Sequence, residues 1–445
     1  MVQSLSNSSG VARNGRKPDS VLSDRKKSGG NAQEVSGPEC RFCGALLRQT
    51  FVDLGMSPLS NSFLRPEQLK QMEPYYPLHA RVCSQCFLVQ LEQFERPENI
   101  FGEYAYFSSY SDSWLRHALK YSEDMIKRWQ LGPKSLVVEV ASNDGYLLQY
   151  FQAKGIRVLG LEPAQNVAQA AKKKGIPTIA RFFGTQTAQD LLAQGDQADL
   201  LVANNVLAHV PDLRAFVAGL KILLKSEGTL TLEFPHLLRL IDGGQFDTIY
   251  HEHFSYFSLS TAERIFAKYA LTVFDVEEFP THGGSLRLFV CHAGAGSRQI
   301  HARVLKLRER EAEAGLSMIQ TYANFGKKVR ETKRALLDLL IGVKRAGKSV
   351  AAYGAPAKGN TLLNYCGIGS GFLDYTVDIS PHKQGLFLPG THIPIFHPDE
   401  IQRTHPDYIL ILPWNLREEI IGQLADVRRW GGRFVIPIPS AEVIG

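Results

Sequence analysis

The chain has 445 residues, of which 44% are hydrophobic and 21% are charged. These proportions are typical of a globular protein, and the length predicts about two to four domains. They exclude a fibrous or wholly disordered chain. The net charge of +6 is uneven, because residues 1–37 hold six Lys or Arg residues against three acids. The remainder is nearly neutral, so the charge gives no indication of nucleic-acid binding.

The N-terminal segment, residues 1–37, is rich in Ser, Gly, Asn and Lys and shows hardly any periodicity. This composition predicts a disordered tail, with a tether to nucleic acid or to a surface as the alternative. The segment lacks the apolar core of a secretory signal. No apolar run in the chain reaches the roughly 18 residues of a membrane span. We therefore expect a cytoplasmic protein.

Four of the six cysteines form two CxxC pairs, Cys40 with Cys43 and Cys83 with Cys86. Two such knuckles supply four thiolates, which bind Zn²⁺ in a closed tetrahedron, so the metal should be structural. A redox role is the alternative for either pair taken alone. Apolar and acidic residues surround the pairs, which favours docking onto the next domain over nucleic-acid binding. We expect this zinc-binding module to span residues 38–98.

An aromatic run, FGEYAYFSSY, follows the module and contains Tyr104 and Tyr106. Aromatic residues at this density are often core residues. Tyrosine hydroxyls next to two serines are equally compatible with the wall of a polar pocket. A helix is predicted to begin near residues 111–114.

Residues 136–162 have the pattern of a nucleoside-binding unit. An apolar strand ends at Glu139, and a helix that begins at about Tyr146 and a second strand ending at Glu162 follow. The turn after the first strand comprises Ala141, Ser142, Asn143, Asp144 and Gly145. Such a turn lets a ligand approach the backbone, and an acid after the second strand binds ribose hydroxyls.

The ligand of this unit is predicted to lack phosphate, because the turn has one glycine and no following Lys-Ser/Thr pair. S-adenosylmethionine fits that description. The stretch resembles motif I of the class I methyltransferases in the form E-x-x-S-N-D-G. An ordinary buried strand, turn and helix is the alternative, but the spacing of Glu139 and Glu162 disfavours it.

The alternation of strands and helices continues, which predicts a doubly wound sheet with ligands at the carboxyl ends of its strands. One apolar strand, residues 199–203, ends at Asn204 and Asn205, and His209 lies just beyond it. A helix over 213–224 and a strand over 228–234 follow. This late part also resembles a class I methyltransferase.

The segment Tyr250-His251-Glu252-His253 is the densest group of titratable residues in the chain. A second polar segment, THGGSLR at residues 281–287, leads into a predicted strand over 288–291. A satisfied polar turn is the alternative explanation of the first segment.

A long charged amphipathic region, residues 299–345, predicts a helical linker to a last domain over 346–445. That domain begins with a strand and then a glycine-flanked turn that opens a helix, which is the pattern of an anion site. Its candidate substrate-binding residues are Gly354, Lys358, Gly359 and Asn360. A simple strand–helix turn is the alternative. Further strands are predicted over 374–378 and 408–412.

The predicted fold class is α/β, with a four-cysteine zinc module, a class I methyltransferase domain over 99–298 and a second Rossmann-like domain. In this order the motifs resemble the three-domain sugar C-methyltransferases, which act on nucleotide-linked 4-keto deoxysugars. The resemblance covers about residues 38–440. It implies S-adenosylmethionine as methyl donor and a sugar nucleotide, with dTDP as the expected nucleotide, as substrate.

The resemblance also implies catalytic positions, which are Tyr250, Glu252 and His253, with His209 nearby and with Tyr104 or Tyr106 approaching the sugar. A carbon next to a ketone must lose a proton before it accepts a methyl group, and His253 suits this task near neutral pH. Tyr250 is expected to stabilise the enolate oxygen. We expect Glu252 to orient a histidine or hold a sugar hydroxyl.

Two other classes of protein remain possible from the residues alone. One is a metal hydrolase that uses His251 and His253 with Glu252, for which no third ligand is evident. The other is a zinc-ribbon methyltransferase that binds RNA, for which the body of the chain lacks a basic, aromatic face. The sequence leaves open the sugar, the methylated carbon (C3 or C5) and the oligomeric state, with a monomer as one option.

Overall fold

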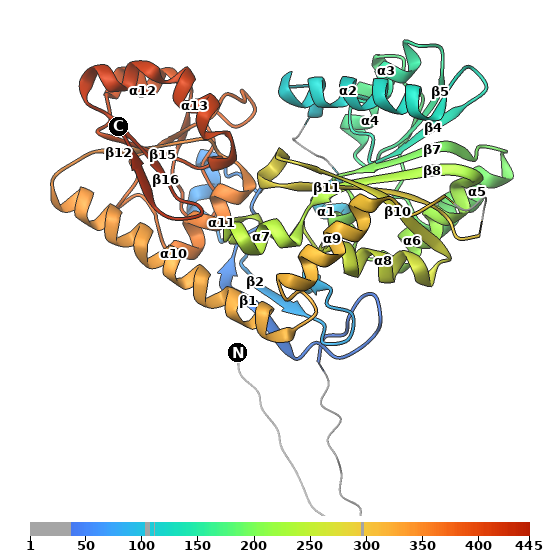
Figure 1. The fold of residues 1–445 in the computed structure, drawn as a ribbon. Helices are drawn as coiled ribbons and strands as arrows, with labels where there is room; N and C mark the ends of the chain where they lie inside the picture. Colours follow the sequence, from blue (N-terminus) through green and yellow to red (C-terminus); the bar gives the residue numbers. More distant parts are fainter. Residues whose placement is uncertain (1–36, 103–106, 111, 295–297) are drawn as a thin grey trace, which may run out of the picture. The chain divides into compact units, whose positions relative to one another are not determined.

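The structure is a computed structural model that describes residues 37–102, 107–110, 112–294 and 298–445. Three β-sheets organise these residues, one for each domain predicted after the tail (Figure 1). In the part of the chain that the structure describes, no helix has the length and apolar character needed to cross a membrane.

The N-terminal module is a four-stranded antiparallel sheet in the order β1-β2-β3-β9. Its strands are β1 (Gln49–Ser57), β2 (Tyr76–Val82), β3 (Val89–Gln90) and β9 (Ser255–Tyr256). The last strand comes from the segment directly after the predicted catalytic residues, and Val89 pairs with Tyr256. The sheet of the module therefore holds that segment in place.

The central domain has a seven-stranded sheet in the order β10-β11-β8-β7-β4-β5-β6. The strands are β4 (Leu136–Val140), β5 (Arg157–Leu161), β6 (Thr178–Ile179), β7 (Ala198–Asn204), β8 (Leu224–Pro235), β10 (Leu271–Phe279) and β11 (Ser285–His292). Strands β4 to β8 are parallel, and β11 runs antiparallel to both of its neighbours. Every residue of β4 is buried, including Glu139, and its other four residues are apolar, as is typical of a central parallel strand.

Helices cover both faces of this sheet (Figure 1). One face packs against α2 (Asp112–Trp129), α3 (Leu148–Gln152) and α4 (Gln165–Lys173). The other packs against α5 (Thr185–Ala193), α6 (Leu213–Leu223) and α8 (Leu259–Lys268). Helix α3 begins two residues later than predicted and has only five residues, because the turn before it is longer than the apolar pattern suggested.

The C-terminal domain has a six-stranded sheet in the order β14-β13-β12-β15-β16-β17. The strands are β12 (Val350–Tyr353), β13 (Thr376–Val377), β14 (Ile395–Phe396), β15 (Tyr408–Ile411), β16 (Arg433–Ile436) and β17 (Glu442–Ile444). All are parallel except the edge strand β17. The helices of this domain are α11 (Ala357–Cys366), α12 (Asp399–Thr404) and α13 (Arg417–Gln423).

The predicted linker is a pair of helices, α9 (Ala302–Glu313) and α10 (Ile319–Arg345). Helix α9 packs on β10, and α10 packs on β1 and α11. The rings of Phe51 and Phe325 stack with centroids 4.5 Å apart, which fixes α10 to the N-terminal module. These helices therefore contribute apolar side chains to the same cores as the domains that they connect.

Short helices connect these elements. They are α1 (Pro97–Phe101), α7 (Leu237–Gly243), η1 (Pro66–Lys70), η2 (Ser108–Tyr110), η3 (Leu207–His209), η4 (Phe246–Thr248), η5 (Thr281–Gly283), η6 (Trp414–Leu416) and η7 (Ala425–Trp430). Among them, η3 and η4 carry or precede the predicted catalytic histidines.

Candidate functional site

The four cysteines of the N-terminal module converge on one point. Their sulfur atoms all lie within 4.8 Å of one another, and the Sγ atoms of Cys40 and Cys86 are 3.5 Å apart. Tetrahedral zinc with Zn–S bonds of about 2.3 Å requires S–S separations of about 3.8 Å, so the set fits Zn²⁺. Gly44 and Phe87, each directly after a knuckle, both have a left-handed backbone.

An outer layer of hydrogen bonds orients this cluster. The side chain of Gln90 donates from Nε2 to the sulfur of Cys40 at 3.2 Å, and its Oε1 accepts from the backbone N–H of Arg41 at 2.9 Å. Donors of this kind stabilise a thiolate and fix its direction. With four protein ligands the site has no open position, so the zinc is structural.

The turn after β4 has an unusual backbone. Ala141 and Asn143 have positive φ angles of 57° and 50°, and Gly145 has φ 79°. A Cβ atom at Gly145 would lie 2.8 Å from the side chain of Ile176, so only glycine fits there. Left-handed non-glycine residues are uncommon and gather at ligand sites. The turn thus has the geometry of a binding loop.

Glu162 connects this turn to the end of β5. Its buried carboxylate accepts hydrogen bonds from the backbone N–H of Asn143 at 3.0 Å and of Ala164 at 2.9 Å. Burial raises the pKa of Glu162, and these two hydrogen bonds oppose the rise. From the described residues, each carboxylate oxygen accepts a single hydrogen bond, which leaves acceptor capacity for a ligand hydroxyl.

Other polar groups at the same strand ends remain unsatisfied. Within the described residues, Ser142 Oγ, Asp144 Oδ1, Asn204 Oδ1 and Asn205 Oδ1 are buried and have no hydrogen-bond partner. Burial also raises the pKa of Glu139 well above its ordinary value. A hydrogen bond with the hydroxyl of Tyr146 favours the charged carboxylate and partly opposes this rise. Buried polar groups are normally hydrogen-bonded, so this cluster fits a polar ligand such as the methionine and ribose of S-adenosylmethionine.

His253 is held in one tautomer. Its Nδ1 lies 2.8 Å from the carbonyl oxygen of Thr248, which can only accept a hydrogen bond. Nδ1 therefore carries the proton, and Nε2 of the neutral ring is an acceptor. Burial lowers the pKa of His253 well below its ordinary value, and the charge of His209 adds to this effect. The imidazole is therefore neutral at pH 7.

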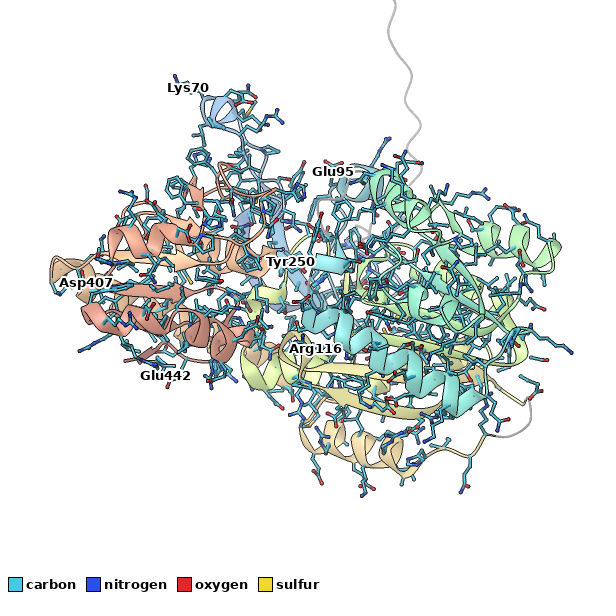
Figure 2. All side chains as sticks on the ribbon, turned by 90° about the horizontal axis from the view of Figure 1, so that it is seen from above. Lys70, Glu95, Arg116, Tyr250, Asp407 and Glu442 are labelled. Atoms are coloured by element: carbon cyan, nitrogen blue, oxygen red, sulfur yellow. The ribbon has the colours of Figure 1, made fainter. Side chains whose placement is uncertain are left out.

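Aromatic and polar residues surround this histidine. The ring centroid of Tyr250 lies 4.0 Å from that of His253, and the centroid of His209 lies 4.6 Å away. Burial lowers the pKa of His209 to about 4, although a hydrogen bond to the backbone of Glu252 acts to raise it. Figure 2 labels Tyr250, which lies near the middle of the view. The structure thus brings together three of the predicted catalytic residues.

Glu252 and His251 point toward the N-terminal module. The carboxylate of Glu252 accepts a hydrogen bond of 2.6 Å from the side chain of Asn61. His251 Nε2 lies 3.2 Å from the carbonyl of Pro77. His251 and His253 therefore do not share a ligand. Among the residues that the structure describes, the four cysteines are the one group of three or more potential metal ligands that converges, which disfavours a metal hydrolase.

In the C-terminal domain, packing explains three of the four candidate residues. A Cβ atom at Gly354 would lie 2.6 Å from Pro413, and one at Gly359 would lie 3.0 Å from Leu412. The side chain of Asn360 donates to the carbonyl of Ser60 at 2.6 Å and so connects α11 to the N-terminal module.

Lys358 differs from these neighbours. Its Nζ donates to Asn415 Oδ1 at 2.5 Å and lies 4.6 Å from the ring centroid of Trp414. Desolvation lowers the pKa of Lys358, and the charge of Asp247 opposes this effect. Its own charge in turn lowers the pKa of His253. The ammonium group therefore lies close to the predicted catalytic base.

Sequence reasoning missed the residues that connect Lys358 to this base. Asp247 in η4 is fully buried, and its Oδ2 accepts a hydrogen bond of 2.7 Å from Trp414 Nε1. Burial raises the pKa of Asp247 to about 6, although the positive charge of Lys358 acts to lower it. Asn61 was missed as well. The sequence carries no local signal for these contacts, because the partners are far apart along the chain.

A buried ionic group at the end of β8 was also missed. The carboxylate of Glu233 accepts hydrogen bonds from Arg287 Nη2 at 2.6 Å and from His117 Nε2 at 3.0 Å. Burial alone would raise the pKa of Glu233, but these partners lower it to about 2. Tyr104 and Tyr106, the remaining predicted catalytic residues, lie outside the described residues.

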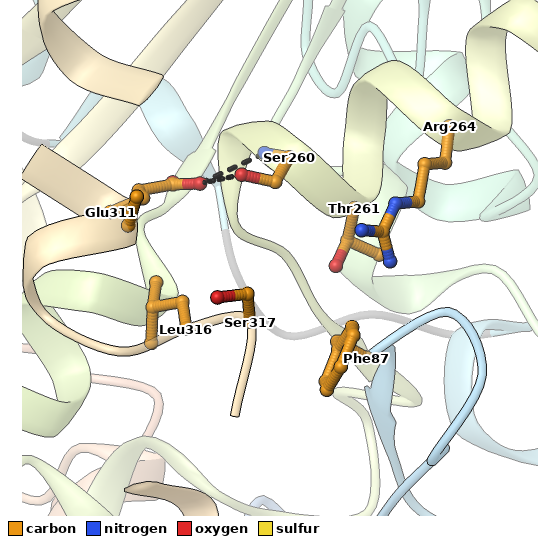
Figure 3. Close-up of a pocket in the computed structure, with 8 residues that line it drawn as sticks. Phe87, Ser260, Thr261, Arg264, Glu311, Leu316 and Ser317 are labelled. Carbon is orange, nitrogen blue, oxygen red and sulfur yellow. Dashed lines mark hydrogen bonds between the residues drawn. The ribbon is translucent and has the colours of Figure 1, made fainter. Parts of the chain in front are cut away.

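A small cavity near α8 is a structural feature rather than a ligand site (Figure 3). Its volume is about 60 Å³, well below the roughly 300 Å³ of a small-molecule pocket. Figure 3 shows that Glu311 bonds to Ser260, and the carboxylate also accepts from the backbone N–H of Leu259 and from His236. Its acceptor capacity is thus used within the chain.

Comparison with known families matches the three parts of the chain in turn. Residues 40–101 match a zinc binding domain, residues 114–276 a methyltransferase domain and residues 280–439 a C-methyltransferase C-terminal domain. The chain is 36% identical over 414 residues to the C-methyltransferase NovU of Streptomyces niveus, covering 93% of this chain and 98% of that protein.

Two weaker similarities are confined to part of the chain. A ubiquinone biosynthesis O-methyltransferase of Methylobacterium is 37% identical over 95 residues, which cover 20% of this chain and 37% of that protein. The magnesium protoporphyrin IX methyltransferase of Synechocystis aligns with 40% of this chain and 83% of its own at 16% identity and a TM-score of 0.32.

Fold and site together define a zinc-containing methyltransferase of class I, as the sequence predicted. More specifically, the chain belongs to the three-domain C-methyltransferase family. It is an S-adenosylmethionine-dependent C-methyltransferase with a structural zinc. The domain boundaries predicted from composition stay predictions, and the family match for the last domain begins at residue 280, within the predicted central domain.

Zinc should be bound in a fixed ratio by these cysteines. Protein purified without added metal should contain about one zinc per chain by elemental analysis, and Cys40→Ala should lose both the zinc and the folded state. The buried Cys291, which lies outside the cluster, supplies the control, because Cys291→Ala should keep its zinc. A folded protein without zinc would contradict the assignment.

Glu162 should contribute directly to cofactor affinity. Glu162→Ala should weaken S-adenosylmethionine binding by about 1.5–3 kcal/mol, roughly 10- to 150-fold, because a charged hydrogen-bond acceptor is lost and the turn is loosened. Calorimetry measures this difference. The exposed Glu123 on α2 is a matched control, and Glu123→Ala should bind normally. Equal affinities for the wild type and Glu162→Ala would show that Glu162 does not bind the cofactor.

Proposed function

We propose that the protein transfers a methyl group to the carbon next to the ketone of a nucleotide-linked 4-keto deoxysugar. The observation that carries this proposal is the environment of His253. The ring is neutral and buried, and the hydrogen bond to Thr248 leaves Nε2 as an acceptor. The similarity to a C-methyltransferase supports the same conclusion, because carbon is nucleophilic only after deprotonation.

The proton next to a ketone is far less acidic than any side chain, so removal requires a positioned base and stabilisation of the enolate. His253 Nε2 takes this proton while Nδ1 keeps its hydrogen bond to Thr248. The resulting imidazolium is stabilised at Nδ1–H by the carbonyl dipole. The lowered pKa keeps the free base neutral, so rates should fall only at pH values below the ordinary value of 6.5.

Tyr250 and Glu252 complete this centre. The phenol ring of Tyr250 packs against His253, and its hydroxyl is proposed to donate a hydrogen bond to the enolate oxygen. Glu252 accepts a hydrogen bond from Asn61 and is proposed to hold a sugar hydroxyl. The ring of His209 also packs against that of His253, with centroids 4.6 Å apart. Tyr104 or Tyr106 is proposed to approach the sugar.

S-adenosylmethionine supplies an electrophilic methyl group when it is bound. Glu162 is proposed to hold its ribose. The turn of Ala141, Ser142, Asn143, Asp144 and Gly145 is proposed to receive its methionine end, with Glu139, Asn204 and Asn205 at the neighbouring strand ends. The unsatisfied oxygens of this group support the assignment.

The nucleotide of the substrate is proposed to lie against the C-terminal domain. Lys358, together with the backbone of the Gly354–Asn360 turn, is proposed to receive the diphosphate. In the described part of the chain, Lys358 forms no ion pair, and its charge is largely desolvated. The charge of Asp247 acts on Lys358 without a direct ion pair, and a desolvated cation of this kind favours an anionic ligand.

The reaction is tested by incubating the pure protein with methyl-labelled S-adenosylmethionine and a panel of dTDP-4-keto sugars. Label should enter one of these sugars at the carbon beside the ketone, and position-resolved NMR of the product distinguishes C3 from C5. Label that appears on oxygen or in none of the sugars would contradict the proposal.

His253→Asn should lower kcat by roughly 10²–10⁴-fold, the usual contribution of a general base, while both ligands still bind. Exchange in D₂O measures the proton transfer separately. With S-adenosylhomocysteine in place of the methyl donor, the wild-type enzyme should introduce deuterium next to the ketone, and His253→Asn should not.

His251→Asn is the control for that experiment, because His251 bonds to Pro77 and faces away from His253. This variant should retain both exchange and methylation. Wild-type methylation by His253→Asn would show that another group is the base.

Lys358→Ala should raise the KM for the sugar nucleotide by at least roughly 10-fold, since a charged hydrogen bond to phosphate is lost, and should leave S-adenosylmethionine affinity unchanged. Steady-state kinetics and calorimetry give the two values. Lys327, exposed on α10, provides the control, and Lys327→Ala should have normal kinetics. A parallel loss of both affinities would contradict a diphosphate role.

A further inference from the structure

The segment THGGSLR has no role in the mechanism so far, yet its backbone is strained. His282 in η5 has φ 56° and ψ 20°, the left-handed conformation, and Gly283 and Gly284 follow with φ 90° and 124°. Side chains other than glycine adopt this conformation rarely, and such residues are concentrated at functional sites.

Neighbouring residues hold this backbone in place. A Cβ atom at Gly283 would lie 2.8 Å from the ring of Trp414, and one at Gly284 would lie 2.7 Å from Arg239. The carbonyl of Gly283 accepts a hydrogen bond of 2.7 Å from the side chain of Gln245. The surroundings therefore impose the conformation of the loop, and His282 must project from it in a fixed direction.

A chain of contacts connects the loop of His282 to the proposed base. Gly283 packs on Trp414, which donates to Asp247, and the next residue, Thr248, holds His253. The ring centroid of His282 is 5.4 Å from that of Trp114, and the residue is exposed. Nevertheless, desolvation lowers the pKa of His282 to about 4, and the charge of Lys358 contributes. His282 also lowers the pKa of His253.

Neither nitrogen of His282 forms a hydrogen bond to another described residue. Another left-handed histidine, His405, has an ordinary structural explanation, because it ends α12 as the C-cap and packs on Trp430. His282 ends no such helix. A strained, unbonded imidazole beside the catalytic base is instead available to a ligand.

We propose that His282 contacts the substrate, and that its imidazole N–H donates a hydrogen bond to an oxygen of the sugar next to the reacting carbon. This inference rests on the proposed function. His282 keeps its proton throughout, while His253 accepts the proton from carbon. The hydrogen bond strengthens as negative charge develops on the sugar oxygen, so His282 acts on kcat more than on KM.

Two variants separate the ring from the backbone. His282→Asn keeps a residue that tolerates the left-handed conformation, and His282→Gly removes both the ring and the strain. Both should lower kcat with the sugar nucleotide by roughly 10- to 1,000-fold, as expected for one lost donor to a developing oxyanion. Melting temperature should be unchanged in the first and unchanged or higher in the second, and calorimetric affinity for S-adenosylmethionine should be normal.

The same pair of changes at His405 is the control, because it alters an equivalent backbone away from the base. His405→Asn and His405→Gly should retain wild-type kcat. Wild-type turnover by both His282 variants would overturn the inference, and so would an activity loss in His282→Asn that merely follows a loss of folded protein. If the wild-type enzyme methylates none of the 4-keto sugars, the proposed function fails first and the inference fails with it.

Discussion

The hydrogen bond from His253 Nδ1 to the carbonyl of Thr248 determines what the site can do. It leaves Nε2 as the proton acceptor in a site where burial already keeps the ring neutral. The carbonyl is fixed in turn by its neighbours, since Asp247 bonds to Trp414, and Ile249 accepts from Thr361. Both partners belong to the C-terminal domain, so the tautomer of the base depends on a contact between domains.

The N-terminal module supports the same segment from the other side. Strand β9 begins two residues after His253 and pairs with β3, and Asn61 holds Glu252. The four-cysteine cluster fixes the ends of the loop before β3 without an open coordination position. Zinc therefore stabilises the sheet that holds the proposed catalytic segment. In the proposed reaction, methyl transfer from a sulfonium to a carbanion proceeds directly between the substrates.

The sequence predicted the features that depend on local spacing and failed for those that depend on distant contacts. Both knuckles, the strand that ends at Glu139 and the order of the domains are visible because a few adjacent residues carry the pattern. Asp247 and Trp414 are separated by 167 residues and Asn61 and Glu252 by 191, and no periodicity connects such pairs. The sequence indicates His282 only as part of a polar segment, because the presence of a histidine does not predict a left-handed backbone.

The protonation state of His253 is the most direct test of this account. Two-dimensional ¹⁵N–¹H NMR of histidine-labelled protein distinguishes the two neutral tautomers and the imidazolium, and His253→Asn assigns the signal. We expect a neutral ring at pH 7 with the proton on Nδ1, and protonation only below the ordinary pKa of 6.5. A proton on Nε2, or an imidazolium at pH 7, would contradict His253 as the base.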